Sequence, residues 1–290
     1  MAGPPVLVTG ATGRFGRAVV AELLEAGVPV RALSRTPLTA GLPAKVEVVA
    51  GDLTDPGSLG PALDGVRSVF LLWTVPIDSA AAVIERMASG PRRVTLLSSP
   101  HRTPHPFFQQ PNPMARLHAE IEDLITDAGL DATFVRPGIL ASNAQFWWGP
   151  AIRAGDVVRW PYGSVETAPI EERDVAAVAA RALYEDGHVG RDYVLTGPAS
   201  LSQAEQVSEI GAVLGRRIRF AELSSEEFRH ETAAAWPAPI VDMLLDAWRA
   251  AAGQPAFVTT SVADVTGRPA RTFREWVADH AGAFALDAGR

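Results

Sequence analysis

The chain of 290 residues is long enough to bury a large core, and its length suggests two domains or one domain with an appended lobe. Its net charge of −7 disfavours nucleic-acid binding, because nucleic-acid binders usually present a basic face. The lack of cysteine excludes disulfides, thiolate nucleophiles and thiolate metal sites. We see no export signal and no apolar run of membrane-spanning length, so we expect a cytoplasmic protein without membrane contact.

The N-terminal segment predicts a strand, a glycine-rich turn and a helix in immediate succession. Val6, Leu7 and Val8 form the short apolar run of a buried parallel strand, and from Phe15 onward apolar residues recur at helical spacing. Glycines follow the strand at positions 10, 13 and 16, where they permit a tight turn, close approach of a pyrophosphate and close packing of the helix. Because N–H groups at a helix start attract anions, we expect a dinucleotide-binding turn rather than a turn without a ligand.

The second predicted strand, at 28–33, indicates which dinucleotide is bound. It ends in Ser34 and Arg35, where NAD-specific proteins usually carry an acidic residue. A carboxylate would repel a ribose 2′-phosphate, whereas a guanidinium forms charge-assisted hydrogen bonds to it. Arg35, with help from Arg14, therefore indicates NADP(H). In the alternative interpretation Arg35 is a solvated charge at the end of a strand.

Strands and helices continue to alternate up to residue 97. We expect strands at 46–50, 68–73 and 93–97, separated by helices that begin near Asp55 and Asp78. Short connections in such an alternation imply right-handed crossovers and a parallel sheet, so the predicted fold class is α/β, a Rossmann-like doubly wound sheet. Trp73, where the fourth strand ends, is either a core residue or part of the cofactor wall.

The second half of the chain departs from this alternation. The prolines of segment 101–113 exclude a helix or a central strand, and we expect that segment to be a loop over the active site. A helix at 114–128, a strand at 132–136, a helix at 171–185, a strand at 193–196 and a helix capped by Ser202 follow. We expect an NADP(H)-binding domain at 1–138 and a smaller substrate-side lobe at 139–290, of which about 165–200 returns to the sheet.

The motifs together resemble those of one family over nearly the whole chain. Gly10–Gly16, His118-Ala119-Glu120, Arg136-Pro137-Gly138 and Tyr193–Pro198 are similar to the NmrA-like atypical branch of the short-chain dehydrogenase/reductase superfamily. The resemblance implies quinone and dye reductases, relatives of isoflavone reductase, or redox-sensing regulators, and it places Asp52 and Leu53 beside the adenine. The expected cofactor-binding residues are Gly10, Thr12, Gly13, Arg14, Phe15, Gly16, Arg35, Asp52, Leu53, Trp73 and Pro137.

The catalytic residues of the usual short-chain reductase are only partly present. The resemblance places Ser98 or Ser99 at the serine position, Met114 at the tyrosine position and His118 at the lysine position. The tyrosine acid is therefore absent, and we expect Ser98 and His118 to be the catalytic residues. His118 would donate a proton or hold the ribose hydroxyls, or it is a structural histidine bordering the apolar face of its helix.

Aromatic residues suggest the kind of substrate. Reducing an isolated ketone creates a basic alkoxide that benefits from a positioned acid, whereas a quinone or conjugated acceptor delocalises the charge. A planar partner would suit a pocket of aromatic side chains, although these side chains are alternatively ordinary core. The expected pocket residues are Phe107, Phe146, Trp147 and Trp160. His101 and His105 lack further ligands nearby, so we expect no metal site.

These observations lead to one main hypothesis and two alternatives. We expect an NADPH-dependent oxidoreductase that reduces an aromatic, quinone-like or conjugated carbonyl small molecule, as a monomer or homodimer. The first alternative is a non-catalytic NADP(H)-sensing regulator, which the missing tyrosine favours. The second is a redox-neutral isomerase or cyclase of a natural-product pathway that uses the same pocket.

Overall fold

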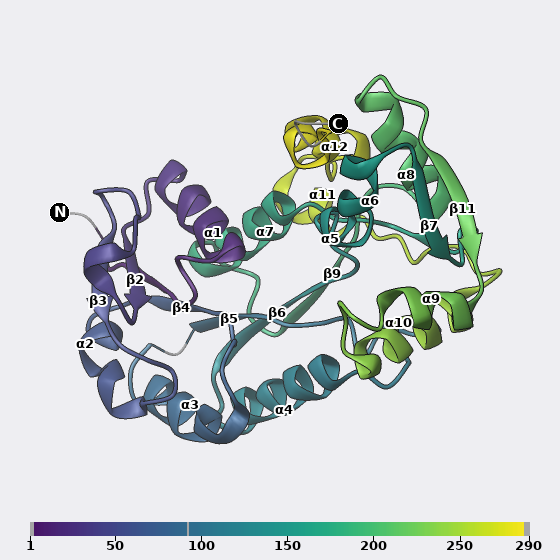
Figure 1. Ribbon diagram of the computed structural model, residues 1–290. Coiled ribbons are helices and arrows are strands. Elements are labelled where there is room, and N and C mark those ends of the chain that lie inside the picture. Colours follow the sequence, from purple (N-terminus) through teal and green to yellow (C-terminus); the bar gives the residue numbers. More distant parts are fainter. Residues whose placement is uncertain (1–2, 92, 287–290) are drawn as a thin grey trace.

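The computed structural model describes residues 3–91 and 93–286 and contains one central parallel sheet (Figure 1). Its strand order is β3-β2-β1-β4-β5-β6-β9, and every neighbouring pair is parallel. The strands are β1 (Val6–Val8), β2 (Val30–Ser34), β3 (Glu47–Ala50), β4 (Ser68–Leu71), β5 (Arg93–Leu97), β6 (Asp131–Pro137) and β9 (Arg191–Leu195). The order reverses between β1 and β4, which is where open parallel sheets bind ligands.

Helices cover both faces of this sheet, which confirms the predicted doubly wound α/β fold. One face is covered by α1 (Arg14–Glu25), α7 (Glu172–Tyr184) and α11 (Ser261–Thr266). The opposite face is covered by α2 (Gly60–Leu63), α3 (Ala80–Ala88) and α4 (Pro113–Asp127), of which α3 and α4 lie side by side beneath the sheet in Figure 1. The middle strands are buried on both sides, and this explains their continuous apolar runs.

Several predicted element boundaries and caps agree with the structure. Ser202 caps α8 (Gln203–Val213) in a reciprocal capping box, and the Asp55 side chain accepts a hydrogen bond from the Gly57 N–H at 3.0 Å. The element that Asp55 begins is a 3₁₀ turn, Pro56–Leu59, leading into α2. Other 3₁₀ turns are Pro37–Thr39, Ile77–Ser79 and Ala281–Phe284. Segment 101–113 contains turns but no helix or strand before Pro113, as its prolines predict.

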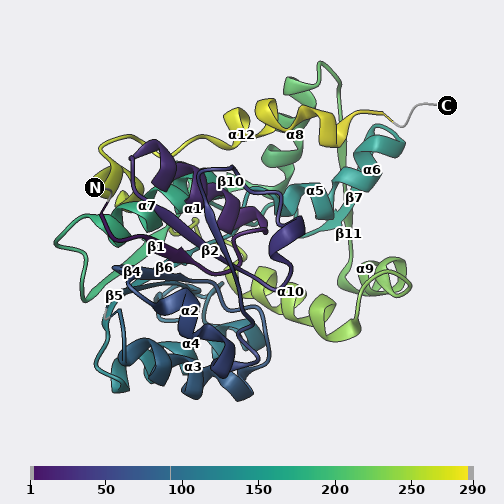
Figure 2. The same cartoon turned by 90° about the vertical axis from the view of Figure 1, so that its left-hand side faces the viewer.

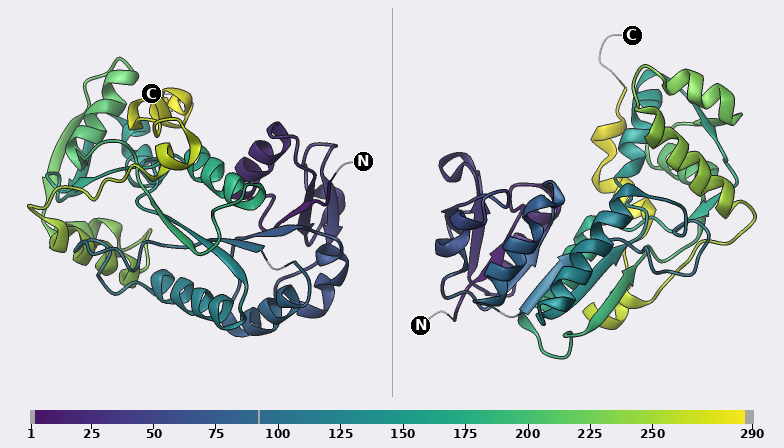
Figure 3. Two further views of the ribbon diagram at one scale, coloured as in Figure 1. Left: turned by 180° about the vertical axis from the view of Figure 1, so that it is seen from behind. Right: turned by 90° about the horizontal axis from the view of Figure 1, so that it is seen from below.

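A second lobe with its own core lies next to β6 and β9 at the right of Figure 1, and it is also at the right of Figure 2. Parallel strands β7 (Val157–Pro161) and β11 (Arg219–Leu223) form its ribbon, and β8 (Glu166–Thr167) pairs with β10 (Leu201–Ser202) in antiparallel fashion. Its helices are α5 (Asn143–Trp147), α6 (Gly149–Ala154), α8, α9 (Ser225–Thr232), α10 (Ala238–Ala251) and α12 (Phe273–Asp279). The views of Figure 3 place this lobe opposite the N-terminal strands.

The chain passes between the two parts more than once. After the first excursion into the lobe, α7 and β9 return to the sheet, where β9 pairs with the edge of β6. Nearly every residue of α7 is buried, because this alanine-rich helix packs against both the sheet and α1. The lobe is therefore built from separate excursions of the chain, which leave the sheet after β6, after β9 and after α11.

Candidate functional site

A cleft of about 600 Å³ lies at the carboxyl ends of β1, β2, β3 and β4. Six of the predicted cofactor-binding residues line it, and they are Gly10, Thr12, Gly13, Arg35, Asp52 and Leu53. The remaining lining residues are Leu33, Ser34, Thr36, Gly51, Leu72, Thr74 and Val75. The cleft thus occupies the position at which parallel α/β sheets bind nucleotides.

The glycine turn between β1 and α1 has the geometry of a phosphate cradle. Gly10 adopts a left-handed backbone with φ +61°, which glycine accepts without strain. A Cβ atom on Gly16 would lie 2.2 Å from the Gly10 carbonyl oxygen, so helix and turn approach as closely as glycine allows. The first turn of α1 contains no acidic residue and its N-cap, Gly13, provides no side-chain acceptor. The helix start can therefore bind an anion, and these residues fit the pyrophosphate of a dinucleotide.

Arg35 provides a positive charge at the side of the cleft formed by β2. It is exposed and forms no ion pair with any carboxylate in the ranges that the structure describes. The Asp52 carboxylate across the cleft accepts a hydrogen bond from the Thr54 N–H at 2.9 Å, and mainly this bond lowers the pKa of Asp52. The cleft therefore combines an ionised acceptor with an available guanidinium.

Five expected cofactor residues do not line the cleft: Arg14, Phe15, Gly16, Trp73 and Pro137. The Arg14 guanidinium pairs with the Glu172 carboxylate at 3.0 Å and lies over the Phe146 ring, so it points away from the site of Arg35. Phe15 packs against the core beneath α1, and Gly16 is buried in the helix–turn contact. Pro137 ends β6, further along the sheet. The suggested help of Arg14 at a 2′-phosphate is not seen in this arrangement.

Trp73 is a core residue in this structure. Its side chain is 1% exposed and packs in the cluster beneath the sheet, away from the cleft. Its neighbours Leu72 and Thr74 line the cleft instead. Successive residues of an extended chain point to opposite faces, so Trp73 cannot share the cleft with both neighbours. Of the two interpretations of Trp73, the core residue is the one that fits.

A second pocket, of about 220 Å³, opens beyond the carboxyl ends of β5 and β6. Segment 99–115 forms one wall, α5 a second and α10 a third. Phe107 and Trp147 line this pocket as expected, together with Phe108, Ile139, Met243 and Leu244. Its polar lining residues include Ser99, His101, Gln110, Asn112 and Asn143, and no lysine or arginine occurs among the described residues that line it.

Two expected pocket residues lie elsewhere. Phe146 is 60% exposed beneath Arg14, because α5 turns it outward while the following residue, Trp147, faces the pocket. Trp160 is 5% exposed in the core of the lobe, where its ring contacts those of Trp148, Phe228 and Trp248 edge to face. The aromatic density of the sequence therefore belongs partly to the pocket and largely to the lobe core.

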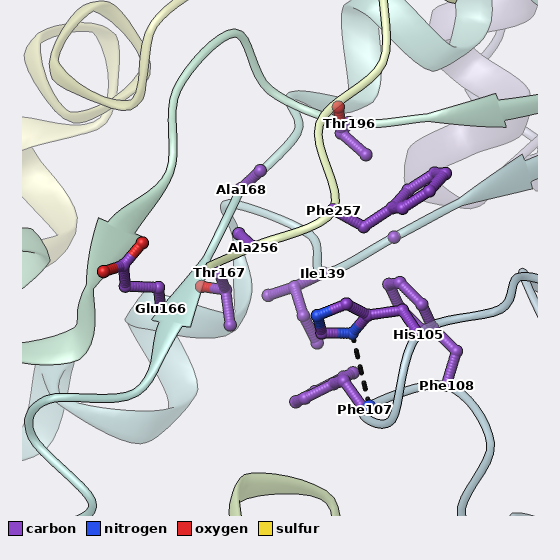
Figure 4. Close-up of a pocket in the computed structure, with 11 residues that line it drawn as sticks. His105, Phe107, Phe108, Ile139, Glu166, Thr167, Ala168, Thr196, Ala256 and Phe257 are labelled. Atoms are coloured by element: carbon purple, nitrogen blue, oxygen red, sulfur yellow. Dashed lines mark hydrogen bonds between the residues drawn. The ribbon is translucent and has the colours of Figure 1, made fainter. Parts of the chain in front are cut away.

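A smaller cavity of about 20 Å³, the volume of about one water molecule, adjoins the pocket (Figure 4). Phe107, Phe108 and Ile139 line both spaces. His105 holds the loop in place, since its Nδ1 accepts the Phe107 N–H at 3.3 Å and its Nε2 lies 3.1 Å from the Pro255 carbonyl oxygen. Segment 101–113 thus forms a fixed wall of the pocket rather than a free loop.

The Ser98 side chain is buried and takes part in a polar hydrogen-bond network. Its hydroxyl donates to the Glu122 carboxylate at 2.6 Å, and Arg136 donates to the same carboxylate at 2.9 and 2.6 Å. Glu122 is 1% exposed and Arg136 is 3% exposed. The residue that follows, Ser99, faces the pocket instead, as alternation along an extended segment requires. The structure therefore gives the pocket-side serine position to Ser99, not to the predicted Ser98.

His118 lies on α4, one turn before Glu122, and is partly buried outside both lining sets. Its Nδ1 is buried without a hydrogen-bond partner. Burial lowers the pKa of His118 to about 4, although Glu122 opposes the shift. His118 is consequently neutral near pH 7, which fits the structural role better than that of a proton donor.

The sequence reasoning missed two residues that matter here, His101 and Glu122. His101 lines the pocket, and its Nε2 lies 3.5 Å from Oε2 of Glu122. The signal for Glu122 was its spacing of four residues from His118 and its place on the buried face of α4. In the sequence His101 stands out only as a candidate metal ligand, together with His105.

Two further findings concern absences within 3–91 and 93–286. No group of three or more His, Asp or Glu side chains in these ranges is placed to hold a metal ion. No helix in these ranges combines the length and the apolar character needed to cross a membrane.

Comparisons with known proteins identify the family. A family model described as NAD(P)H-binding matches residues 10–186. The chain is 40% identical over 287 residues to a (4-alkanoyl-5-oxo-2,5-dihydrofuran-3-yl)methyl phosphate reductase of Streptomyces griseus, covering 97% of this chain and 99% of that one. It is 33% identical over 287 residues to an NAD(P)H azoreductase of Xenophilus azovorans, covering 96% and 99%.

A solved structure supports the same assignment. An NADPH-dependent quinone oxidoreductase from Escherichia coli is 26% identical and superposes with a TM-score of 0.81, covering 95% of this chain and 99% of that one. The chain therefore belongs to the NAD(P)H-binding family, in the NmrA-like atypical branch of the short-chain dehydrogenases/reductases.

Proposed function

We propose that this protein is an NADPH-dependent oxidoreductase that reduces a planar aromatic, quinone-like or conjugated carbonyl compound. One observation carries the proposal: an aromatic-walled pocket without lysine or arginine among its described lining residues opens at the same sheet edge as the dinucleotide cleft. The cleft lies over β1 to β4 and the pocket over β5 and β6, which are neighbours in the sheet. In this division residues 1–138 bind the cofactor, while the substrate lies against the lobe of 139–290.

The side chains of the pocket suit a flat acceptor. Bound NADPH would supply a hydride, and the protein has to hold the acceptor and exclude water. Phe107 and Trp147 offer aromatic surfaces to a planar ring. The amides of Asn112 and Asn143 can donate hydrogen bonds to its carbonyl oxygens. Such a combination of apolar walls and few polar groups is typical of small-molecule sites.

The preference for NADPH rests on Arg35. An exposed guanidinium without a carboxylate partner at the end of β2 is suited to a 2′-phosphate. No acidic residue occupies the positions directly after β2, Arg35 and Thr36, that would repel such a phosphate. Since Arg14 is engaged by Glu172, Arg35 carries this preference without it.

The names of the relatives support a conjugated acceptor. They describe a reductase of an acylated dihydrofuranone phosphate, an azoreductase and a quinone oxidoreductase. Each of these acceptors places the charge of an added hydride on more than one atom. No lysine or arginine among the described lining residues is placed to bind a phosphate, which argues for a substrate that, unlike the first of these, carries no phosphate group.

The test is the steady-state oxidation of NADPH with a panel of acceptors. Quinones, cyclic enones and an azo dye should be reduced, whereas saturated ketones of the same size should not. NADH should support the reaction only at a higher concentration. Preferential reduction of saturated ketones, or no oxidation with any conjugated acceptor, would refute the proposal.

The missing tyrosine also favours a second candidate, a regulator that senses NADP(H). Such a protein would bind NADP⁺ and NADPH with different consequences for a partner protein, which pull-down with each form would detect. A redox-neutral isomerase would form product without net loss of NADPH.

We further propose that the protein is cytoplasmic and either a monomer or a homodimer, which cell fractionation and light scattering would establish.

A further inference from the structure

We propose that Ser99, His101 and Glu122 form a proton relay that delivers a proton from the pocket wall to the reduced substrate. The inference rests on the proposed reductase function and replaces the missing tyrosine with groups from other positions. Ser99 and His101 both line the pocket. Glu122 stands behind them on α4, 1% exposed. The order of the groups from pocket to core is therefore hydroxyl, imidazole, carboxylate.

The hydrogen bonds of His101 define where its protons lie. Nδ1 is 3.0 Å from the Ser99 carbonyl oxygen and 3.5 Å from the Ser99 hydroxyl oxygen. A carbonyl oxygen only accepts hydrogen bonds, so Nδ1 must carry a proton. Nε2 faces Oε2 of Glu122 at 3.5 Å. Nε2 is buried without a hydrogen-bond partner, so its contact with Glu122 is an ion-pair distance only. A ring protonated on both nitrogens turns an N–H rather than a lone pair towards the carboxylate.

The buried network leaves a negative charge for this imidazolium. Glu122 receives hydrogen bonds from Ser98 at 2.6 Å and from Arg136 at 2.9 and 2.6 Å. Arg136 also pairs with Asp192 at 2.7 Å, so one guanidinium faces two carboxylates. A buried carboxylate needs its remaining charge compensated. The approach of His101 to Oε2 of Glu122 supplies that compensation.

The other titratable groups around the relay do not take its role. Arg102 lies 3.9 Å from Oε2 of Glu122, but it is 57% exposed and also pairs with Asp123. His118 is neutral near pH 7, because burial lowers its pKa to about 4. Among the described residues, His101 is thus the group that joins the carboxylate to the pocket.

The proton transfer balances without a further reagent. Hydride addition leaves an oxyanion on the acceptor. The Ser99 O–H bond breaks as its proton moves to that oxyanion, and the Nδ1–H bond of His101 breaks to restore the hydroxyl. His101 becomes a neutral imidazole that keeps its Nε2–H against Glu122. A proton from water then reprotonates Nδ1 of His101 between turnovers.

The first test compares Ser99→Ala, His101→Gln and the double variant with the wild type. General acids contribute roughly 100-fold or more to rate, so each single variant should lose about 100-fold in kcat with a cyclic enone. The loss with a quinone should be smaller, since its anion is already delocalised. Because the groups act in series, the double variant should be no slower than the slower single variant. His230→Gln, which removes an exposed histidine on α9, is the matched control.

The pH profile separates a relay from a structural role. The pH profiles of kcat should differ between the wild type and His101→Gln, because the variant has no ionisable group between Ser99 and Glu122. A profile with the same slope in both proteins would overturn the proposal, as would single variants that lose less than about 3-fold in kcat with the enone.

A binding measurement tests the relay without turnover. 4-Nitrophenolate is a planar oxyanion whose absorbance reports its protonation, and it serves as the probe. Its Kd should rise about 10-fold or more in Ser99→Ala and His101→Gln, because a hydrogen bond to a charged group is lost, and stay unchanged in His230→Gln. Equal Kd values in all four proteins would overturn the relay. If the wild type reduces no acceptor but this difference in Kd appears, the proposed function fails, whereas the contact of Ser99 and His101 with a bound oxyanion stands.

Discussion

Replacing Gly16 by alanine tests whether the glycine turn is built for close contact. The added Cβ would lie 2.2 Å from the Gly10 carbonyl oxygen and 2.6 Å from the Ala11 Cα, and contacts below 3.0 Å essentially do not occur. Both contacts are with backbone, so α1 or the turn has to move by about 1 Å. Overpacking of this kind costs about 1–3 kcal/mol. At about 2–4 °C per kcal/mol, Tm should fall by about 2–12 °C.

The same movement should weaken cofactor binding, because it displaces the N–H groups at the start of α1. We expect the Kd for NADPH, measured by calorimetry, to rise about 10-fold, which corresponds to ~1.4 kcal/mol. Gly60→Ala is the matched control: its Cβ would meet nothing within 4 Å, and Gly60 has a helical backbone. That control should be neutral or slightly stabilising. A Gly16→Ala protein with the Tm and Kd of the wild type would refute the close-packing argument.

Three further predictions concern the cofactor, the substrate and the effect of pH. Arg35→Ala should raise the Kd for NADPH about 10-fold to 100-fold, because hydrogen bonds to charged groups contribute ~1.5–3 kcal/mol. The Kd for NADH should stay unchanged. An equal rise in the Kd values of the two cofactors would exclude a contact between Arg35 and the 2′-phosphate. Trp147→Ala should raise KM for planar acceptors, whereas Phe146→Ala, which removes an exposed ring outside the pocket, should not. An equal change of KM in the two variants would contradict the role of Trp147 as a wall of the acceptor site. Burial lowers the pKa of His118 from its ordinary value of 6.5 to about 4 in the folded protein. The unfolded state therefore binds the proton first, and stability should fall as pH drops from about 6.5 to 4. This contribution to the free energy of unfolding is about 2–3 kcal/mol. Urea unfolding of His118→Gln should show a smaller loss of stability between pH 6.5 and 4 than the wild type. The same dependence of stability on pH in the two proteins would show that His118 is not held neutral.

The sequence was a good guide to elements whose local pattern matches their environment. The apolar run Val6–Val8, the glycine turn and the cap at Ser202 each depend on neighbours a few residues away, and each agrees with the structure. Arg35 could be placed at the cleft for the same reason, since it directly follows a strand whose carboxyl end faces the cleft. Short-range physics and the known geometry of parallel sheets were sufficient there.

Long-range contacts determine the positions of the side chains that could not be predicted from the sequence. Arg14 is drawn to Glu172, a partner 158 positions away, and a local pattern cannot reveal that pairing. The choice between Ser98 and Ser99 depends on which face of the chain meets α4, and the buried Glu122 settles it. Trp147, Trp148 and Trp160 look alike in sequence, but one lines the pocket while the others fill the lobe core. Side-chain direction after the end of a strand or in a short helix is set by packing, not by composition.

The repeated return of the chain to the sheet affects how this protein is synthesised and how it varies. Strand β9 and helix α7 follow the first excursion, so the sheet lacks an outer strand and part of its cover until residue 195 has left the ribosome. A nascent chain ending at Gly138 would expose the edge of β6 and the apolar face beneath α7, which favours association with other chains. The first two excursions leave the sheet directly after β6 and β9. Substitutions within them can therefore reshape the substrate pocket while the dinucleotide cleft keeps its form.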